Sequence, residues 1–160
     1  MSDKAGLARL KKLIEGIRVG LLTTVDLDGT LHTRPIETLR CDDDGTLWFF
    51  TDHHSPKANE LSHDLRVSLG YADPAKNVYV AVAGHARILR DKALAADLWS
   101  FAQRAWYPKG LDDEHLSVLR VTPERAEYWE TPGKASYLLA AAAAAVTGQP
   151  ATVAPGHKLP

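Results

Sequence analysis

The stretch VGLLTTVDLDGTLHTRPIETL, residues 19–39, decides the fold class of this chain. Two β-prone segments flank Asp28-Gly29, a dipeptide that is typical of the tight turn in a β-hairpin. Pro35 lies within the second segment and has no N–H group to donate to a neighbouring strand. We therefore expect an antiparallel hairpin whose second strand lies at a sheet edge, or contains a bulge or bend at Pro35.

Short β-prone segments continue on the C-terminal side of this hairpin. The acidic turn CDDDGT precedes one strand, and Asp73-Pro74 marks a later turn. The longest segment is expected to bend at Gly84, where one strand continues into the next. The strands predicted after the hairpin are 46–51, 66–73, 77–90, 116–123 and 124–130.

Helical signals lie at both ends of the chain and in two crossings. Apolar residues at helical spacing from Leu7 to Ile17 predict an amphipathic first helix, and an alanine-rich run predicts a last helix from Gly133 onward. Ser55 and Pro56 suit the start of a helix over residues 55–65. Asp91 suits the cap of another, whose shared apolar face would be Leu94, Leu98, Phe101 and Ala105.

The order of these elements predicts the fold class. Hairpin turns dominate, and no regular alternation of strands and helices occurs along the chain. We therefore expect an antiparallel barrel or sandwich of the α+β class, with roughly seven strands.

Composition describes an ordinary globular domain. The chain has 160 residues, of which 45% are hydrophobic and 24% are charged, so a single domain with a hydrophobic core is expected. A net charge of −1 provides no basic field for nucleic acid or an anionic membrane. The N-terminus lacks an apolar signal-peptide core, residues 137–146 are too few to cross a bilayer, and a single cysteine fits a reducing compartment. We expect a cytoplasmic protein with neither a nucleic-acid nor a membrane partner.

A lysine at the start of the predicted helix 55–65 indicates a possible anion site. The first N–H groups of a helix and its dipole favour negative charge, yet Lys57 lies in the first turn. Thr51 and Ser55 add hydroxyl groups beside it. A bound phosphate would explain the lysine, and a side chain that simply extends into water is the alternative.

Two further clusters bear on this site. Arg34 lies in a strand that otherwise alternates around apolar residues, so its side chain points to solvent or to a ligand. If the strands 30–40 and 46–51 are neighbours, Arg34 and Lys57 could converge on one anion. Trp106 and Tyr107 occupy a polar loop, where stacking on a flat cofactor or packing across a dimer interface would use them. Trp99 and Phe101 lie among apolar residues and are expected in the core.

The histidines and the cysteine do not form a known catalytic or metal motif. His53 and His54 are adjacent, so their side chains are expected to diverge, and the other histidines are scattered. The chain has no HExxH, GxSxG, GxGxxG or Walker motif. Cys41 is expected to be an unreactive, half-buried cysteine at a strand end. We therefore expect no metal site and no nucleophile.

The order of several motifs resembles a known family. HTRPIETL, LWFFT, SPKANEL, DLRVSLGY, VYVAVAGHARIL and AWYPKGLDDEHLSVLRVTPERAEYW occur with the expected gaps in the general stress protein 26 family, part of the pyridoxamine 5′-phosphate oxidase-like, FMN-binding split-barrel proteins. The likeness extends from about Leu7 to Val146. It implies a mainly β, α+β fold: a six- to seven-stranded antiparallel split β-barrel with flanking helices. Length and composition further predict one domain over residues 1–147, followed by a proline-rich, flexible C-terminal tail, residues 148–160.

The resemblance also implies a homodimer with FMN, or FAD as an open alternative, in clefts at the subunit interface. Arg34, Ser55 and Lys57 match positions that hold the phosphate. The backbone of the arginine strand and the end of the following strand would flank the ring, with Trp106 nearby and Asn77 as a polar position before the long strand. The implied cofactor-binding residues are Arg34, Pro35, Ile36, Glu37, Thr38, Leu39, Phe50, Thr51, Ser55, Lys57, Asn77 and Trp106.

Two departures from the oxidase pattern narrow the function. Pro56 occupies a position where the oxidase has an arginine, and the segment after Trp129 lacks the oxidase's Arg-x-His pattern. We therefore do not expect pyridoxine 5′-phosphate oxidation. The remaining expectations are a general stress FMN-binding protein that acts as an oxidoreductase on an unknown substrate, a non-catalytic flavin carrier or stress sensor, and a split barrel that binds haem or a deazaflavin.

Overall fold

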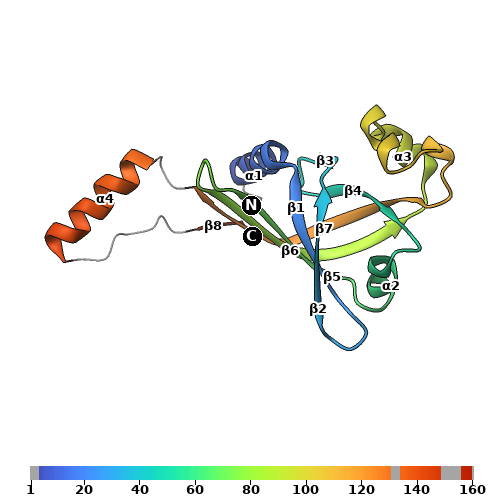
Figure 1. Ribbon diagram of the computed structural model, residues 1–160, viewed down its shortest axis with the longest axis horizontal. Coiled ribbons are helices and arrows are strands. Elements are labelled where there is room, and N and C mark those ends of the chain that lie inside the picture. Colours follow the sequence, from blue (N-terminus) through green and yellow to red (C-terminus); the bar gives the residue numbers. More distant parts are fainter. Residues whose placement is uncertain (1–3, 131–133, 149–155, 160) are drawn as a thin grey trace.

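One antiparallel sheet forms the centre of the molecule (Figure 1). The computed structural model describes residues 4–130, 134–148 and 156–159. Within these residues the strand order is β2-β1-β5-β6-β7-β4-β3, and β8 pairs with β7. The strands are β1 Val19–Val25, β2 Leu31–Glu37, β3 Arg40–Cys41, β4 Leu47–Asp52, β5 Arg66–Asp73, β6 Val78–Leu89, β7 Leu116–Glu130 and β8 His157–Leu159. The sheet curls into a split β-barrel, which confirms the predicted mainly β, α+β class.

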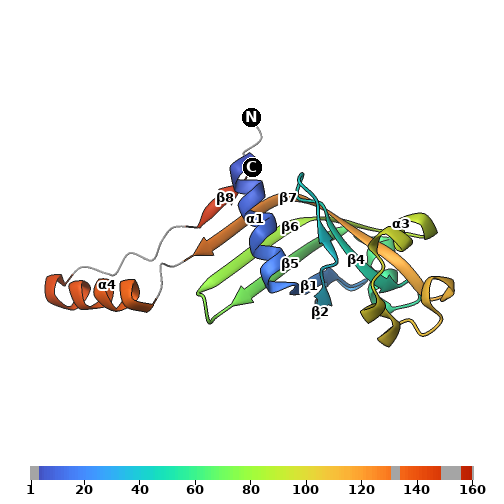
Figure 2. The same cartoon turned by 90° about the horizontal axis from the view of Figure 1, so that it is seen from above.

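Helices flank this sheet. They are α1 Lys4–Ile17, α2 Pro56–His63, α3 Lys92–Leu98 and α4 Lys134–Thr147, with short 3-10 helices η1 Phe101–Ala105 and η2 Gly110–Asp112. Helix α1 lies along the sheet, whereas α4 stands apart from it in both views (Figures 1 and 2). None of the helices in the described ranges is both long and apolar enough to cross a membrane.

The predicted hairpin is present, and its turn explains the Asp-Gly pair. The N–H of Asp26 donates to the carbonyl of Thr30 at 2.8 Å, and the N–H of Gly29 donates to the carbonyl of Asp26 at 2.9 Å. Gly29 has φ +83°, a left-handed conformation that glycine adopts without strain. Pro35 lies in β2, which forms one edge of the sheet, so one of the predicted roles for this proline is confirmed.

A glycine bulge shapes the long strands. The register of β6 with β7 shifts between Ala83 and Gly84, at the predicted bend. A Cβ atom on Gly84 would lie 2.1 Å from the carbonyl oxygen of Thr122, so only glycine allows the two backbones to approach this closely. The strand continues through the bend, and the pieces predicted at 116–123 and 124–130 likewise form one strand, β7.

Alternating burial along the strands builds the core. Strand β5 alternates exposed and buried residues almost throughout, which places one face of the curled sheet inward. Helix α1 covers the main core with Leu10, Leu13 and Ile14. A second cluster packs beneath α3 and supports the wall of the cleft described below; its buried members are Trp48, Phe50, Ala95, Leu98 and Val118.

Two sequence expectations require correction. Helix α3 ends at Leu98, because the chain becomes extended at Trp99 (φ −70°, ψ 136°), so Phe101 and Ala105 do not share its apolar face. Phe101 is 84% exposed and does not join the core. Trp99, in contrast, packs against the second core cluster, as expected. Within the tail predicted at residues 148–160, residues 157–159 form β8, whose backbone pairs with Ala126–Tyr128 of β7.

Candidate functional site

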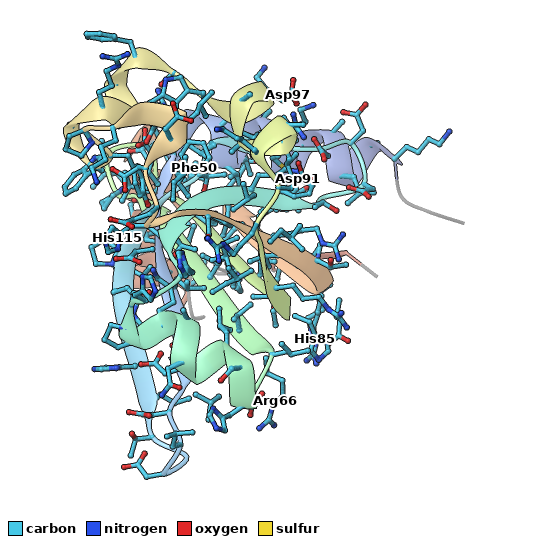
Figure 3. All side chains as sticks on the ribbon, turned by 90° about the vertical axis from the view of Figure 1, so that its right-hand side faces the viewer. Phe50, Arg66, His85, Asp91, Asp97 and His115 are labelled. Carbon is cyan, nitrogen blue, oxygen red and sulfur yellow. The ribbon has the colours of Figure 1, made fainter. Side chains whose placement is uncertain are left out.

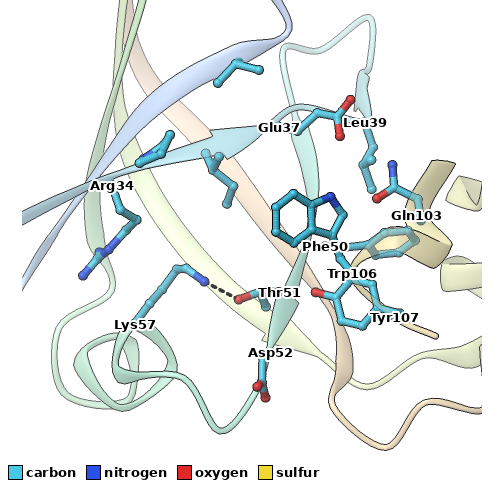
Figure 4. Close-up of a pocket in the computed structure, with 13 residues that line it drawn as sticks. Arg34, Glu37, Leu39, Phe50, Thr51, Asp52, Lys57, Gln103, Trp106 and Tyr107 are labelled. Carbon is cyan, nitrogen blue, oxygen red and sulfur yellow. Dashed lines mark hydrogen bonds between the residues drawn. The ribbon is translucent and has the colours of Figure 1, made fainter. Parts of the chain in front are cut away.

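A cleft opens where the two ends of the sheet meet. Strands β2 and β3 are joined by Thr38 and Leu39 alone. The N–H of Thr38 donates to the carbonyl of Arg18, on the β1 side, and the N–H of Leu39 donates to the carbonyl of Trp48, on the β4 side, both at 2.8 Å. Beyond this point β2 and β4 diverge, and a cleft of about 590 Å³ lies between them and the η1 segment (Figure 4).

Most of the residues that the sequence singled out line this cleft. They are Arg34, Pro35, Ile36, Glu37, Leu39, Phe50, Thr51, Lys57 and Trp106. Val19, Asp52, Gln103 and Tyr107 complete the lining. Residues from β2, β4, α2 and η1 therefore meet in one place, although the expected pairing of the arginine strand with the strand 46–51 is wrong. Strand β2 pairs with β1, and β4 pairs with β3 and β7, so the curl of the sheet brings Arg34 and Lys57 to one cleft.

Three of the singled-out residues do not line the cleft. Thr38 is buried, and its hydroxyl bonds to that of Tyr71 at 2.7 Å. Ser55 is the N-cap residue of α2, but its hydroxyl donates to the carbonyl of Asp52 at 2.6 Å instead of capping the helix. Asn77 lies in the turn between β5 and β6, where it has φ +51°.

Lys57 is the cation whose charge is not neutralised locally. It lies in the first turn of α2, half-buried, and its Nζ donates to the Thr51 hydroxyl at 2.6 Å (Figure 4). No carboxylate of the described residues lies within ion-pair distance of this ammonium. Burial, and then the nearby charge of Arg34, lower the pKa of Lys57. A bound anion in the cleft would favour the charged form of Lys57 and so oppose both effects on its pKa.

Arg34, in contrast, is held by a buried carboxylate. Its guanidinium donates to Glu60 at 2.7 Å and 3.1 Å and also bonds to the hydroxyl of Thr24. Glu60 is 3% exposed and also accepts from Thr24, while His32 Nδ1 lies 3.0 Å from its Oε1. Burial alone would raise the pKa of Glu60, but the hydrogen bonds from Thr24, His32 and Arg34 lower it to about 2. Arg34 and Glu60 therefore neutralise each other, and Lys57 is the cation of the cleft that has no ion-pair partner among the described residues.

Strand β2 presents unpaired backbone groups to the cleft. Because Thr38 bonds to Arg18, and bonded pairs alternate along an antiparallel ladder, Ile36 and Arg34 also bond to β1. Glu37 is then left with its N–H and carbonyl pointing away from β1, and Pro35 occupies a position where no donor is needed. These groups can bond the polar edge of a flat ligand.

Aromatic side chains form the opposite wall. Phe50 packs against Tyr107 edge to face, with ring centroids 6.0 Å apart, and against Trp99 at 5.8 Å. Trp106 is 76% exposed at the mouth of the cleft. Burial, followed by the charges of Asp52 and Asp113, raises the pKa of Tyr107 to about 12, so its phenol stays neutral. The cleft thus suits a ligand with an anionic end and a flat, largely apolar part.

Sequence reasoning missed several groups at this site. Tyr107 was named with Trp106 as an aromatic residue of the loop but was left out of the implied cofactor-binding set, although it lines the cleft. Gln103, which is 4% exposed, and Glu60 had no local signal. Glu60 is recognisable only from the contacts that it makes with β1 and β2, across 26 to 36 residues of sequence.

The histidines and the cysteine are placed differently from their expectation. The rings of His53 and His54 do not diverge, because their centroids lie 3.9 Å apart, and His115 joins them. No histidine of the described residues lines the cleft, so the haem alternative has no axial ligand there. Cys41 is fully buried, and burial raises the pKa of its thiol to about 12, which agrees with an unreactive cysteine.

Comparison with known proteins identifies the family. The model of the family described as pyridoxamine 5′-phosphate oxidase like matches residues 6–151. General stress protein 26 of Bacillus subtilis (strain 168) is 32% identical over 110 residues, which cover 67% of this chain and 76% of that protein.

Solved structures agree with this match. The general stress FMN/FAD binding protein from the phytopathogen Xanthomonas citri superposes with a TM-score of 0.70 at 26% identity, covering 82% of this chain and 92% of that one. A protein related to general stress protein 26, from Clostridium acetobutylicum, has the same fold, with a TM-score of 0.71 at 23% identity and coverage of 80% and 90%. The split barrel and the cleft agree with these matches, which show that the chain belongs to the pyridoxamine 5′-phosphate oxidase-like family.

Proposed function

We propose that this chain binds FMN in the cleft between β2 and β4, as a flavin protein of the general stress type. The observation that carries the proposal is the half-buried Lys57, which has no carboxylate partner among the described residues and faces an aromatic wall across the cleft. A cleft of about 590 Å³ lies within the range of about 300–1,000 Å³ that is typical of small-molecule sites. The similar protein from Xanthomonas citri is an FMN/FAD binding protein, which supports the same ligand class.

The phosphate would bind at the α2 end of the cleft. Lys57 supplies the charge, and its backbone N–H, in the first turn of the helix, is a second donor. Arg34 uses Nη1 and Nη2 for Thr24 and Glu60, so its Nε–H remains available. The hydroxyl of Ser55 must leave the carbonyl of Asp52 before it can donate to a phosphate. Lys57 is therefore the principal phosphate ligand in this proposal, with Arg34 in support.

The ring would bind between the edge of β2 and the aromatic wall. Glu37 offers a backbone donor and acceptor to the polar edge of the ring, and Phe50 and Thr51 flank it from β4. Trp106 is positioned to cover an exposed face of the ring. When bound, the flavin supplies the redox chemistry, whereas these residues bind it, orient it and exclude water.

We further propose that the protein is a homodimer, in which a second copy covers the outer face of β1, β5 and β6. Val19, Leu21 and Tyr79 are 53%, 54% and 43% exposed, and the register places them on one face of adjacent strands. Val19 also lines the cleft, so a partner on this face would reach its rim. A charged replacement, Leu21→Asp, should produce monomers in light scattering and weaken FMN binding. A wild-type chain that is monomeric at all concentrations would contradict this proposal.

Titration of the purified chain with FMN tests the main proposal. We expect quenching of the flavin fluorescence with saturation at one FMN per chain, and weaker binding of riboflavin, which lacks the phosphate. A parallel titration with FAD measures the preference between the two flavins. Absence of quenching by FMN would contradict the assignment.

Reduction of the bound flavin separates an enzyme from a carrier. We propose an oxidoreductase, for which NAD(P)H should bleach the visible absorption of the bound flavin on the order of once per second or faster, as for typical enzyme turnover. Tight binding of FMN with bleaching that is slower by orders of magnitude would instead establish a carrier or sensor.

The buried, free Cys41 fits the cytoplasm, where we propose that the protein acts.

A further inference from the structure

We infer that Asp52, His53, His54 and His115 form a binding site for a divalent transition-metal ion of the zinc class. The site lies at the end of β4 and the start of β7, beside the cleft, and Asp52 is its one residue that also lines the cleft. It does not depend on flavin binding, so the two proposals can fail separately.

Strand register brings the two histidine segments together. The antiparallel ladder of β4 and β7 ends at the pair Asp52 and Leu116. The next residues, His53 and His115, are linked by a backbone hydrogen bond from the N–H of His53 to the carbonyl of His115, at 3.4 Å. Histidines that are 62 positions apart in the sequence are therefore fixed at one sheet end.

The side chains converge instead of dispersing. His115 Nδ1 lies 3.3 Å from Asp52 Oδ2, and His54 Nδ1 lies 3.8 Å from Asp52 Oδ1. The rings of His54 and His115 have centroids 5.3 Å apart, and those of His53 and His54 are 3.9 Å apart. One donor atom each of Asp52, His53 and His54 lies within 4.8 Å of the other two.

These separations are close to those of a zinc coordination sphere. Ligand atoms at about 2.0–2.1 Å from a tetrahedral ion lie about 3.3–3.4 Å from one another. The pair formed by Asp52 and His115 already has this separation, and the pair formed by Asp52 and His54 needs a shift of only a few tenths of an ångström. Imidazole nitrogen and carboxylate oxygen are ligands that zinc accepts readily, and side-chain rotation alone can close the remaining distance.

Neighbouring groups hold the ligands in place. Asp52 Oδ1 accepts the backbone N–H of His54 at 2.8 Å, and Asp113 accepts the backbone N–H of His115 at 3.1 Å. Ser117 is 2% exposed, and its hydroxyl lies 3.3 Å from His53 Nδ1, which leaves His53 Nε2 as a possible fourth ligand. Hydrogen bonds of this kind orient metal ligands in known sites.

The site is open to solvent on one side. The side chains of His54 and His115 are 63% and 51% exposed, so an ion can reach them without opening the fold. Figure 3 shows His115 at the left of the molecule and His85 at its lower right. His85 pairs with Glu124 and takes no part in the cluster. Three histidines and a carboxylate at one sheet end distinguish this cluster from His85 and from His63, which bonds to Ser62 and Asn59.

The test is zinc binding by the flavin-free chain, purified without a histidine tag. Calorimetric titration with zinc chloride should show one equivalent per chain, and cobalt chloride should give the visible absorption of a four- or five-coordinate cobalt ion. His54→Ala and His115→Ala should each weaken zinc binding by at least about 10–100-fold, the range known for loss of even an outer partner of a metal ligand. His63→Ala, an exposed histidine on α2, is the matched control and should bind zinc like the wild type.

Folding of the variants is checked by thermal unfolding without metal, and zinc should raise the unfolding temperature of the wild type and His63→Ala only. Two results would overturn the inference. One is the absence of a single zinc equivalent in the wild type. The other is zinc binding by His54→Ala and His115→Ala that equals the wild type, which would leave the cluster as hydrogen-bonded surface histidines.

Discussion

Replacement of Lys57 by methionine separates ligand binding from fold stability. In the structure the ammonium is half-buried, bonds to Thr51 at 2.6 Å and has no carboxylate partner among the described residues. Methionine retains the packing of the aliphatic stem and removes the charge. The proposed function therefore predicts opposite signs for two measurements on Lys57→Met: weaker FMN binding, and a more stable flavin-free protein.

The size of the binding effect follows from the type of contact. A hydrogen bond to a charged group contributes about 1.5–3 kcal/mol, so FMN binding should weaken by about 10- to 140-fold. Riboflavin, which lacks the phosphate, should be almost unaffected.

The sign of the stability effect follows from the pKa of Lys57. Burial and Arg34 lower this pKa in the folded state, so the folded protein binds the proton less tightly than the unfolded chain does. Stability of the wild type should therefore rise with pH from the lowered pKa up to the unfolded value of 10.5, and Lys57→Met should lack this rise. At neutral pH the variant should unfold at a higher temperature than the wild type.

Fluorescence titration with FMN and riboflavin, together with thermal unfolding of the flavin-free proteins, provides the measurements. Lys92→Met, at an exposed lysine on α3, is the control and should bind both flavins like the wild type. Equal losses of affinity for FMN and riboflavin in Lys57→Met would refute the phosphate assignment. Arg34→Ala is a less direct probe, because it removes the partner of the buried Glu60 and should destabilise the fold as well.

Three further predictions follow from named contacts. Glu60→Gln should lower the free energy of unfolding by about 3 kcal/mol at pH 7, because the pKa of Glu60 falls from 4.5 to about 2 in the folded protein. In urea unfolding, the wild type should lose this contribution as the pH falls from about 4.5 to about 2, whereas the variant should show no such loss. Trp106→Ala should weaken FMN and riboflavin binding equally, by about 1–3 kcal/mol for a lost stacking contact, without changing the unfolding temperature, because the side chain is 76% exposed. Gly84→Ala should destabilise the protein by at least about 1–3 kcal/mol in urea unfolding, because the added Cβ would meet the Thr122 carbonyl at 2.1 Å.

Each of these has a control or a contradicting outcome. Gly16→Ala, in α1, adds a Cβ that meets nothing within 4 Å, and should stabilise the helix by about 0.5–1 kcal/mol. A Glu60→Gln variant that keeps the full acid-dependent loss would show that Glu60 does not carry it. A Trp106→Ala variant with unchanged flavin affinity would place the ring elsewhere in the cleft.

Local chemistry was sufficient to predict the elements of the fold. Three features depend on the backbone of one or two residues and can be predicted from the sequence directly. They are the turn at Asp28-Gly29, the bend at Gly84, and the edge position of Pro35, which has no N–H group to donate. The long strands β6 and β7 were harder, because a bulge keeps a strand continuous through a residue that resembles a break. The end of α3 at Leu98 was missed because the apolar spacing continues through Phe101, although the chain is no longer helical there.

The candidate site was predictable where its residues carried a local anomaly. Lys57 at a helix start and Trp106 in a polar loop contradict their surroundings, and both line the cleft. Asn77 was taken from the resemblance alone and lies in a turn that does not line the cleft. Ser55 was expected to act as a free hydroxyl, but the nearby carbonyl of Asp52 occupies it.

By itself, the sequence determined the antiparallel β class, the hairpin and the cationic helix start, because these depend on residues within a few positions of one another. Only the tertiary structure decided how the charges are distributed. Glu60 neutralises Arg34, so Lys57 is left as the cation of the cleft without an ion-pair partner among the described residues. The pairing of β4 with β7 likewise brings His115 to His53 and His54. Such interactions depend on distances across the sheet, which are set by strand order and register and leave no local signal along the chain.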